Sequence, residues 1–385
     1  MARIIYVTHS YAPQDRKFLQ KLSEVHEVWF VPWTQSSPSE SRPVPDGVQR
    51  LPALNNGHEA KLIKWARSVK RLREYVAKVR PDVIQAGPLQ TGTFVAVLSG
   101  FRPLIAMSWG YDVLSLGRRT ALMRWIGRFT LTRAKYVVVD CDAARERVLS
   151  MAPLKAEQVI CFPYGIDLDT FHPAVSRLQL RAKLGWEKNR VLIMTRRFEP
   201  IHGTMIFLEA MIDVFRKCPD TRVLMVGDGS LRPQVDAFIE NHGLREKFYL
   251  PGQVPEAILA DYYNEADLYV SATHSDGASI SLLQAMGCGL PVVVAGEDGN
   301  LEWVQHGRNG WLYPAGDGRA LAAAIVEGLN DQPSRMRMGR ANSALASERA
   351  NWDTNVQKLL TAYDQIVDPE SKFADKPPSY EPSTL

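Results

Sequence analysis

Short β-branched runs alternate with helix-length stretches along most of this chain, and no other feature constrains its fold as strongly. In the first half, the runs Arg3–Thr8 and Glu27–Pro32 are each followed by a loop or a stretch of helical composition. Similar runs follow at 82–85, 104–108 and 136–139. Strands that alternate with helices in this way form parallel sheets covered on both faces.

The second half repeats this alternation, with strands expected at 191–195, 222–226, 248–250, 268–271 and 291–295. A chain of 385 residues suits two domains better than one. We therefore predict an α/β fold of two doubly wound, Rossmann-like domains that face each other across a cleft. Ligands of such sheets bind at the carboxyl ends of the strands.

The irregular segment 163–188 separates the two halves and is the expected linker. The predicted domains cover residues 1–165 and 166–352, and a helix at 353–367 is expected to pack back on the first domain. The tail 368–385 is polar and contains four prolines. It has too little apolar surface to order itself and is predicted to be disordered.

Composition narrows the class of protein further. The four cysteines form no CxxC pair, which argues against a zinc ribbon or a disulfide scaffold and favours a reducing cytosol. The charge-free stretch Val83–Phe101 is interrupted by Gly, Pro, Gln and Thr, so it does not resemble a membrane-spanning helix. We expect a cytoplasmic protein, either soluble or peripheral on the inner face of a membrane.

Charge is divided unevenly along the chain. Residues 1–165 carry 24 Lys and Arg against 13 Asp and Glu (net +11), whereas residues 166–385 carry 22 against 29 (net −7). Many of the bases lie in two predicted helices, at 60–79 and 120–132, and the second is rich in apolar residues. Such a helix suits an anionic membrane surface, with a solvated charged face as the alternative. No recognised nucleic-acid-binding module accompanies the charge, so nucleic acid is not an expected partner.

The segment 271–291 carries the strongest candidate site. A strand ends there in a loop of small residues, and a helix is predicted to begin near Ser281. Its first N–H groups are unpaired and lie at the positive end of the helix dipole, so a diphosphate can dock there. Asp276 before the helix and Gln284 inside it would face that ligand. From this segment alone, an ordinary capped helix with Gln284 on its surface fits equally well.

Several further motifs occur in a fixed order along the chain. They are PYGID at 163–167 with Phe171 and Pro173, Arg197 with Gly203, VGDG at 226–229, QAMGCGLPVV at 284–293, and the set Asn300, Glu302, Gly307, Gly310 and Leu312. In this order they resemble the motifs of the retaining GT-B glycosyltransferases of family 4, and the resemblance covers nearly the whole chain.

The resemblance implies the GT-B fold and a hexosyl-type transfer from a nucleotide diphosphate sugar, with retention of the anomeric configuration. It implies a glycan, lipid-linked or small-molecule acceptor, and neither a cofactor nor a bound metal. In this reading Asp276, Arg197 and Asp112 are catalytic. The donor-binding residues are Arg197, His202, Gly227, Val254, Asp276, Ala278, Ser279, Ile280, Ser281 and Gln284.

Two arginines follow the strand at 191–195, and Arg side chains suit bidentate phosphate contacts. The alternative is a surface ion pair with Glu199. The motif spacing assigns the phosphate to Arg197 and leaves Arg196 with an ordinary role. His202, in the position of the family's lysine, would supply a cation only part of the time near neutral pH.

On the acceptor side, the resemblance points to Tyr11, Trp109 and Asp112. Trp109 stands where many members carry a histidine, and its ring suits stacking on a sugar, although a core tryptophan fits too. Asp15 is predicted to cap a helix rather than to touch an acceptor.

The departures from the family pattern keep other functions open. Asp276 and Gln284 replace two glutamates, and the family's N-terminal Gly-Gly loop is absent. A nucleotide-sugar-binding protein with weak or lost turnover and a sugar-nucleotide epimerase are therefore the alternatives. The two DxD patterns, at 140–142 and 167–169, are interpreted as structural, because so short a pattern recurs by chance.

Overall fold

The structure is a computed structural model and describes residues 1–9, 11–34, 43–55, 61–115, 120–274 and 277–367. The chain divides into two compact units. The first comprises residues 1–139, 147–160 and 356–385, and the second comprises residues 140–146 and 161–355.

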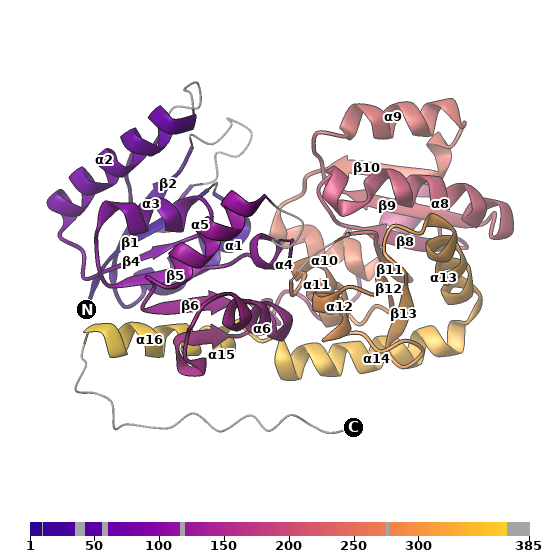
Figure 1. The fold of residues 1–385 in the computed structure, drawn as a ribbon. Coiled ribbons are helices and arrows are strands. Elements are labelled where there is room, and N and C mark those ends of the chain that lie inside the picture. Colours follow the sequence, from indigo (N-terminus) through magenta and orange to yellow (C-terminus); the bar gives the residue numbers. More distant parts are fainter. Residues whose placement is uncertain (10, 35–42, 56–60, 116–119, 275–276, 368–385) are drawn as a thin grey trace. The chain divides into compact units, whose positions relative to one another are not determined.

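The first unit is built on a seven-stranded sheet of order β3-β2-β1-β4-β5-β6-β7 (Figure 1). Strands from β3 to β6 pair in parallel. The strands are β1 (Arg3–Thr8), β2 (Glu27–Pro32), β3 (Val48–Arg50), β4 (Val83–Ala86), β5 (Leu104–Met107), β6 (Tyr136–Val139) and β7 (Val159–Cys161). The helices are α1 (Pro13–Ser23), α2 (Lys61–Val79), α3 (Gly92–Ser99), α4 (Tyr111–Leu114), α5 (Ala121–Leu131) and α16 (Gln357–Val367). Helix α6 (Asp142–Met151) begins in the second unit, and the first unit contains it from residue 147 on.

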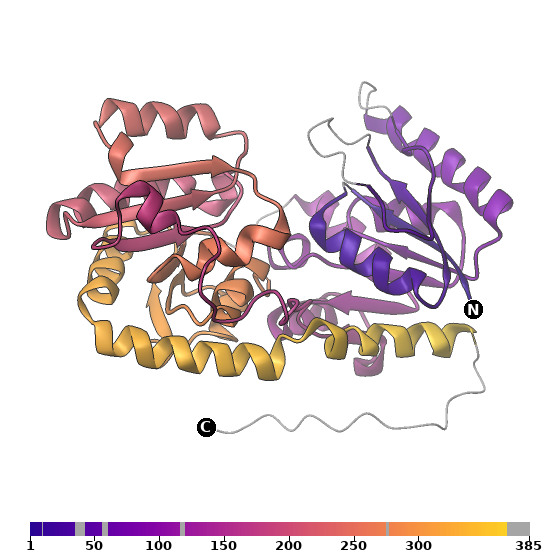
Figure 2. The ribbon, with the colours of Figure 1, turned by 180° about the vertical axis from the view of Figure 1, so that it is seen from behind.

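Alternation of side chains along these strands supplies an apolar layer on each face of the sheet. Ile5, Val7 and Ile84 point to the face that α2 and α3 cover. The opposite face carries α16, whose buried Tyr363 donates a hydrogen bond to Gln85 Oε1 of β4 (Figure 2). Helix α16, the last one in the described part of the chain, is therefore an integral part of the first unit.

The second unit holds a six-stranded sheet of order β10-β9-β8-β11-β12-β13, with parallel neighbours throughout. The strands are β8 (Arg190–Met194), β9 (Thr221–Val226), β10 (Phe248–Gly252), β11 (Leu268–Ser271), β12 (Val292–Ala295) and β13 (Gly310–Tyr313). The longer helices are α8 (Thr204–Lys217), α9 (Arg232–Asn241), α10 (Glu256–Asn264), α11 (Ile280–Gly287), α13 (Gly318–Asn330) and α14 (Gln332–Arg349). The short ones are α7 (Leu180–Leu184), α12 (Asp298–Leu301) and α15 (Trp352–Asn355).

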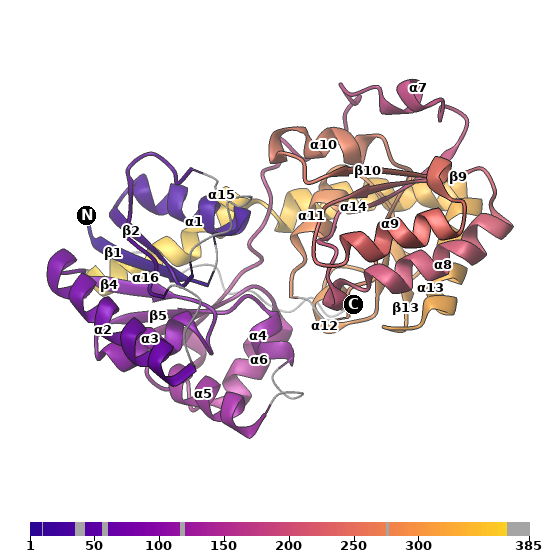
Figure 3. The ribbon, with the colours of Figure 1, turned by 90° about the horizontal axis from the view of Figure 1, so that it is seen from above.

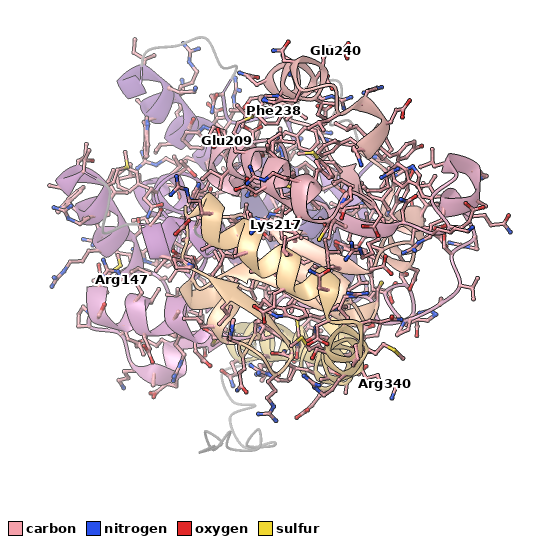
Figure 4. The ribbon with its side chains drawn as sticks, turned by 90° about the vertical axis from the view of Figure 1, so that its right-hand side faces the viewer. Arg147, Glu209, Lys217, Phe238, Glu240 and Arg340 are labelled. Carbon is pink, nitrogen blue, oxygen red and sulfur yellow. The ribbon has the colours of Figure 1, made fainter. Side chains whose placement is uncertain are left out.

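Helices cover both faces of this second sheet (Figure 3), and an apolar core lies on each face. Leu192, Val223 and Val293 face α8, α9 and α13, whereas their neighbours Ile193 and Leu224 face α10, α11 and α14. Figure 4 looks onto the α8 and α13 side, where Glu209 and Lys217 mark α8 and Phe238 marks α9. The two doubly wound parallel α/β domains predicted from the sequence are thus present.

The boundary between the units differs from the expected one. The sequence predicts a linker at 163–188, but this segment belongs to the second unit. Its residues Ile166 and Phe171 are fully buried in the core on the α10, α11 and α14 side of the second sheet. Ile166 also donates a backbone hydrogen bond to Ala350 O at 2.8 Å, which ties the segment to the end of α14. Residues 368–385, predicted to be disordered, lie outside the described residues.

Candidate functional site

The start of α11 lies at the carboxyl edge of the second sheet. Helix α11 begins at Ile280, with Ser279 as an extended N-cap, one residue before the predicted start. Ser279, Ser281 and Ala278 are all buried, and β11 ends eight residues earlier, at Ser271. Asp276 lies outside the described residues.

The side chain of Arg196 is directed at this helix terminus. Its Nη1 donates to Ser279 Oγ at 2.8 Å and to Ser281 Oγ at 3.1 Å. Arg196 follows β8, the strand beside β11, and for that reason it reaches the same edge of the sheet. The N–H groups at the start of a helix and a guanidinium both attract negative charge, so the arrangement suits an anionic ligand.

Arg197 occupies a different place. Its side chain is 60% exposed, and its Nη2 lies 3.8 Å from Glu199 Oε1. The motifs predict that Arg197 binds the phosphate and that Arg196 has an ordinary role, whereas in this structure the side chain that reaches the helix terminus is that of Arg196. Motif spacing identifies the residues that follow the strand, but it does not encode which way each side chain points.

His202 lies beside Arg196, with its Nδ1 at 3.0 Å from Arg196 Nη2. Burial, together with the charges of Arg196 and Arg197, lowers the pKa of His202 to about 3. His202, expected from the sequence to be a cation part of the time near neutral pH, is therefore neutral there in the unliganded protein. A neutral imidazole can accept a hydrogen bond from the arginine.

Two glycines allow the loops around Arg196 to approach one another. Gly203 has a φ of +64°, and a Cβ there would lie 2.1 Å from Ala272 O. Gly227, predicted to bind donor, would place a Cβ 2.4 Å from Arg196 O. Both positions need glycine for close backbone contact. Val254, the other predicted donor residue of these loops, is half-buried against the α11 core.

Gln284 is buried rather than on the surface of α11. Its Oε1 accepts a hydrogen bond from Tyr263 OH at 3.2 Å. The same hydroxyl also bonds Thr195 Oγ1 at 2.6 Å and Ser281 O at 3.2 Å. Tyr263, which sequence reasoning missed, therefore ties β8 to the first turn of α11. A neutral amide suits this site, since burying a carboxylate costs more.

In the first unit, Asp112 is fully engaged by its own loops. It is 1% exposed, and its carboxylate accepts from Ser108 Oγ at 2.7 Å, Trp109 N at 2.9 Å and Leu89 N at 2.9 Å. Burial raises the pKa of Asp112. These contacts give Asp112 a structural role in its own loops, and the catalytic role expected from the sequence stays a prediction.

The other residues predicted for the acceptor side also pack internally. Tyr11 is buried against Phe30, and its hydroxyl donates to Pro43 O at 3.1 Å. Trp109 is half-buried and packs edge-on against Phe18. The structure thus does not bring Tyr11 and Asp112 forward as substrate contacts.

Asp15 caps α1 from its third position, with its Oδ2 accepting from Ala12 N at 2.8 Å and its Oδ1 from Tyr6 OH at 3.0 Å. The second DxD pattern forms a local turn, in which Asp167 accepts from Asp169 N at 3.0 Å. Among the residues that the structure describes, no three His, Cys, Asp or Glu side chains are grouped to hold a metal.

One other depression, of about 620 Å³, lies between α8 and the start of α13. It is lined by Glu209, Asp213 and the loop 315–319, and it shares no residue with the predicted site. Within the described part of the chain, no helix is long and apolar enough to cross a membrane.

Two doubly wound parallel α/β units, one with a cation and a helix terminus at its carboxyl edge, define a GT-B architecture. The chain belongs to the Glycosyl transferases group 1 family: residues 176–345 match that family, and residues 7–165 match the Glycosyl transferase 4-like domain.

The chain has curated relatives among bacterial glycosyltransferases. It is 27% identical over 249 residues to the D-inositol 3-phosphate glycosyltransferase of Thermobispora bispora, a match that covers 62% of this chain and 55% of that protein. It is also 27% identical over 286 residues to a GDP-mannose-dependent phosphatidylinositol monomannoside mannosyltransferase of Mycolicibacterium smegmatis, covering 71% and 73%. The chain thus spans only about half the length of the inositol-phosphate relatives it matches.

Solved structures confirm the fold. HepE of Anabaena, crystallised with UDP-glucose, superimposes with a TM-score of 0.78 at 20% identity, covering 95% of this chain and all of that one. Sucrose-phosphate synthase of Thermosynechococcus elongatus gives a TM-score of 0.81 at 17% identity, covering 96% and 100%.

Proposed function

We propose that this protein transfers a hexosyl group from a nucleotide diphosphate sugar to an acceptor, with retention of the anomeric configuration. The observation that carries the proposal is the guanidinium of Arg196 at the N-terminus of α11. Family membership and relatives named as glycosyltransferases support it. HepE, which shares the fold, was solved with UDP-glucose.

In the proposed site, the diphosphate would lie beside Arg196 at the N-terminus of α11. The N–H groups at the start of α11 and the hydroxyls of Ser279 and Ser281 would donate to it. Negative charge builds on the leaving phosphate as the glycosidic bond breaks, so donors fixed there lower the barrier. These protein groups supply positive charge at the phosphate, and we propose that no metal or cofactor is required.

The remaining donor contacts follow from position on α11 and its preceding loop. Gln284, one turn inside the helix, would donate from its amide nitrogen to a ribose hydroxyl, while its oxygen stays with Tyr263. Asp276 keeps its proposed role of orienting the sugar. With no separate nucleophile assigned, we propose that the leaving phosphate assists attack by the acceptor on the same face.

The buried amide of Gln284 favours one competing function. Its hydrogen bond to Tyr263 and the neutral state of His202 weaken the charge assistance that a donor would receive. A protein that binds nucleotide sugar without turnover would have these features. Incubation with a panel of nucleotide sugars and acceptors separates the two functions, because only an enzyme releases nucleoside diphosphate.

The decisive experiment on the site compares two neighbouring arginines. Arg196→Ala should weaken binding of a nucleoside diphosphate by about ten- to a hundredfold and leave nucleoside binding nearly unchanged, because a charged hydrogen bond is lost. Arg197→Ala is the matched control and should cost much less. Isothermal titration with a panel of nucleoside diphosphates measures both. Equal losses for diphosphate and nucleoside in Arg196→Ala would refute the phosphate role.

We also propose that α5 rests on an anionic membrane surface, where a lipid-linked acceptor would be found. Leu122 and Trp125 are 61% and 55% exposed on this helix, beside the exposed bases Arg124 and Arg128. Bases at an anionic surface and an inserted indole both favour such contact. The mycobacterial relative is named for a phosphatidylinositol substrate, which fits this location.

Vesicle flotation tests the membrane contact. The protein should float with phosphatidylglycerol vesicles at low salt, and the double change Leu122→Ser with Trp125→Ser should release it. Leu301→Ser is the matched control, since Leu301 is 50% exposed in the second unit. Equal flotation of all three proteins, or none with wild type, would contradict the proposed surface.

A further inference from the structure

Asp140 makes a long-range contact with the entrance to α11. It follows β6 in sequence, but residues 140–146 belong to the second compact unit. Its side chain is buried, 5% exposed, and its Oδ2 accepts a hydrogen bond from Ala278 N at 3.1 Å. The two residues are 138 positions apart, and Ala278 directly precedes the N-cap Ser279.

Gly277 shows how closely the two segments approach. A Cβ at this position would lie 2.1 Å from Asp140 Oδ2 and 2.6 Å from Asp140 Cγ. A methyl group at 277 would therefore have to displace the Asp140 carboxylate.

The segment that carries Asp140 is itself fixed to the second unit. Glu302 accepts hydrogen bonds from Ala143 N at 2.9 Å and from Asp142 N at 3.1 Å, the first amides of α6. A carboxylate at a helix N-terminus is favourable, so this contact stabilises the start of α6. Glu302 thus holds the segment from which Asp140 reaches Ala278.

We propose that Asp140 is a positioning residue for the donor site: its carboxylate fixes Gly277 and Ala278, and so sets the N-cap Ser279 and the first amides of α11 for a diphosphate. The inference rests on the proposed function of that helix terminus. Asp140 does not touch the ligand in this proposal. It acts through Ser279, which also receives the guanidinium of Arg196.

The test uses the full chain with three single variants. Asp140→Ala removes the acceptor, Asp140→Asn keeps an oxygen that can accept from Ala278, and Asp142→Asn is a matched control on the same segment. We expect Asp140→Ala to speed amide hydrogen exchange in the 277–282 region, and to weaken nucleoside diphosphate binding about tenfold with nucleoside binding unchanged. Asp140→Asn should restore most of both, and Asp142→Asn should resemble wild type.

A second cycle tests the contact through Gly277. Gly277→Ala should lower the melting temperature in the wild-type background, where the new methyl group meets the carboxylate, and much less in the Asp140→Ala background. If the changes in melting temperature caused by Gly277→Ala and Asp140→Ala are additive, the two residues are not in contact. Unchanged amide hydrogen exchange of the 277–282 region in Asp140→Ala would overturn the positioning role. Tighter diphosphate binding by Asp140→Asn would also overturn it, because it would show that the Asp140 carboxylate repels the ligand. If wild type binds no nucleoside diphosphate, the proposed function fails, while exchange and the Gly277 cycle still decide the contact.

Discussion

The two units have the same parallel architecture but use the polar residues at the carboxyl edges of their sheets differently. In the first unit, Asp15 and Asp112 are buried, and each accepts backbone hydrogen bonds from its own loops. In the second unit, Arg196 contacts Ser279 and Ser281 at the start of α11 and also His202, which lies in the same connection between β8 and α8 as Arg196. Polar groups at one edge hold loops in place, and those at the other converge on a helix terminus.

This contrast shows why a residue's position after a strand does not settle its role. The same edge of a doubly wound sheet is where ligands bind, but it is also where loops need caps. A carboxylate that already accepts hydrogen bonds from backbone amides stabilises the fold and has fewer acceptor positions left for a ligand. A guanidinium beside the N–H groups of a helix N-terminus gathers positive charge at one place, which suits an anionic ligand.

The largest expected effect is on the pH dependence of stability, through Asp15, because burying its carboxylate costs free energy. Burial raises the pKa of Asp15 from 3.8 to about 7. The folded state therefore holds a proton on Asp15 more tightly than the unfolded state does, so the contribution of Asp15 to stability is fully present below about pH 4 and is lost as the pH rises through 7. Three pKa units correspond to at most about 4 kcal/mol. Asp15→Asn should remove most of this loss, as measured by urea unfolding at pH 5 and pH 8.

Asp46→Asn, an exposed carboxylate in the same unit, is the control and should leave the pH dependence unchanged. Asn at position 15 keeps an oxygen that can accept from Tyr6 OH or Ala12 N. If Asp15→Asn instead destabilises the protein equally at both pH values, ionisation of the buried Asp15 carboxyl is not the cause of the pH dependence. The contrast between the carboxyl edges of the two sheets would then be weaker.

Much of the fold could be predicted from the sequence because strand and helix signals are local. The β-branched runs marked both sheets, and the order of the motifs identified the family. The unit boundary was harder, since the burial of Ile166 and Phe171 depends on contacts with distant helices. Likewise, the assignment of residues 140–146 to the second unit follows from contacts of Asp140 and Glu302 that no local pattern reveals.

The site was predicted in part. The helix terminus near Ser281 formed as expected, since small residues after a strand and a helix pattern are both visible in the sequence. The exchange of Arg196 and Arg197 escaped prediction because spacing fixes which residues lie in a loop but not which way each side chain points. The burial of Tyr11 and Asp112 escaped it too, because a polar or aromatic residue after a strand suits a cap or a core as well as a ligand.

A smaller effect is expected for the pH dependence of diphosphate binding, through His202. It tests the contrast between the two sheet edges in the second unit. Because the pKa of His202 is about 3 in the unliganded protein, a diphosphate beside it should raise that pKa by adding negative charge. Binding would then take up a proton, so affinity should rise as the pH falls, by at most about tenfold per pH unit below the pKa of the complex. Titration calorimetry from pH 8 to pH 5, in buffers of different ionisation heat, measures both the affinity and the proton uptake.

His202→Gln is the control for this titration, because it keeps a hydrogen-bonding side chain for Arg196 but cannot gain a proton. It should bind diphosphate with little pH dependence beyond that of the phosphate itself. The same low pKa predicts that the unliganded wild type loses stability as the pH falls below 6.5, where an unfolded histidine takes up its proton, and that His202→Gln loses less. The two effects have opposite signs at acid pH, tighter binding but a weaker fold, so one series of measurements distinguishes a histidine that meets the ligand from one that is merely buried beside Arg196.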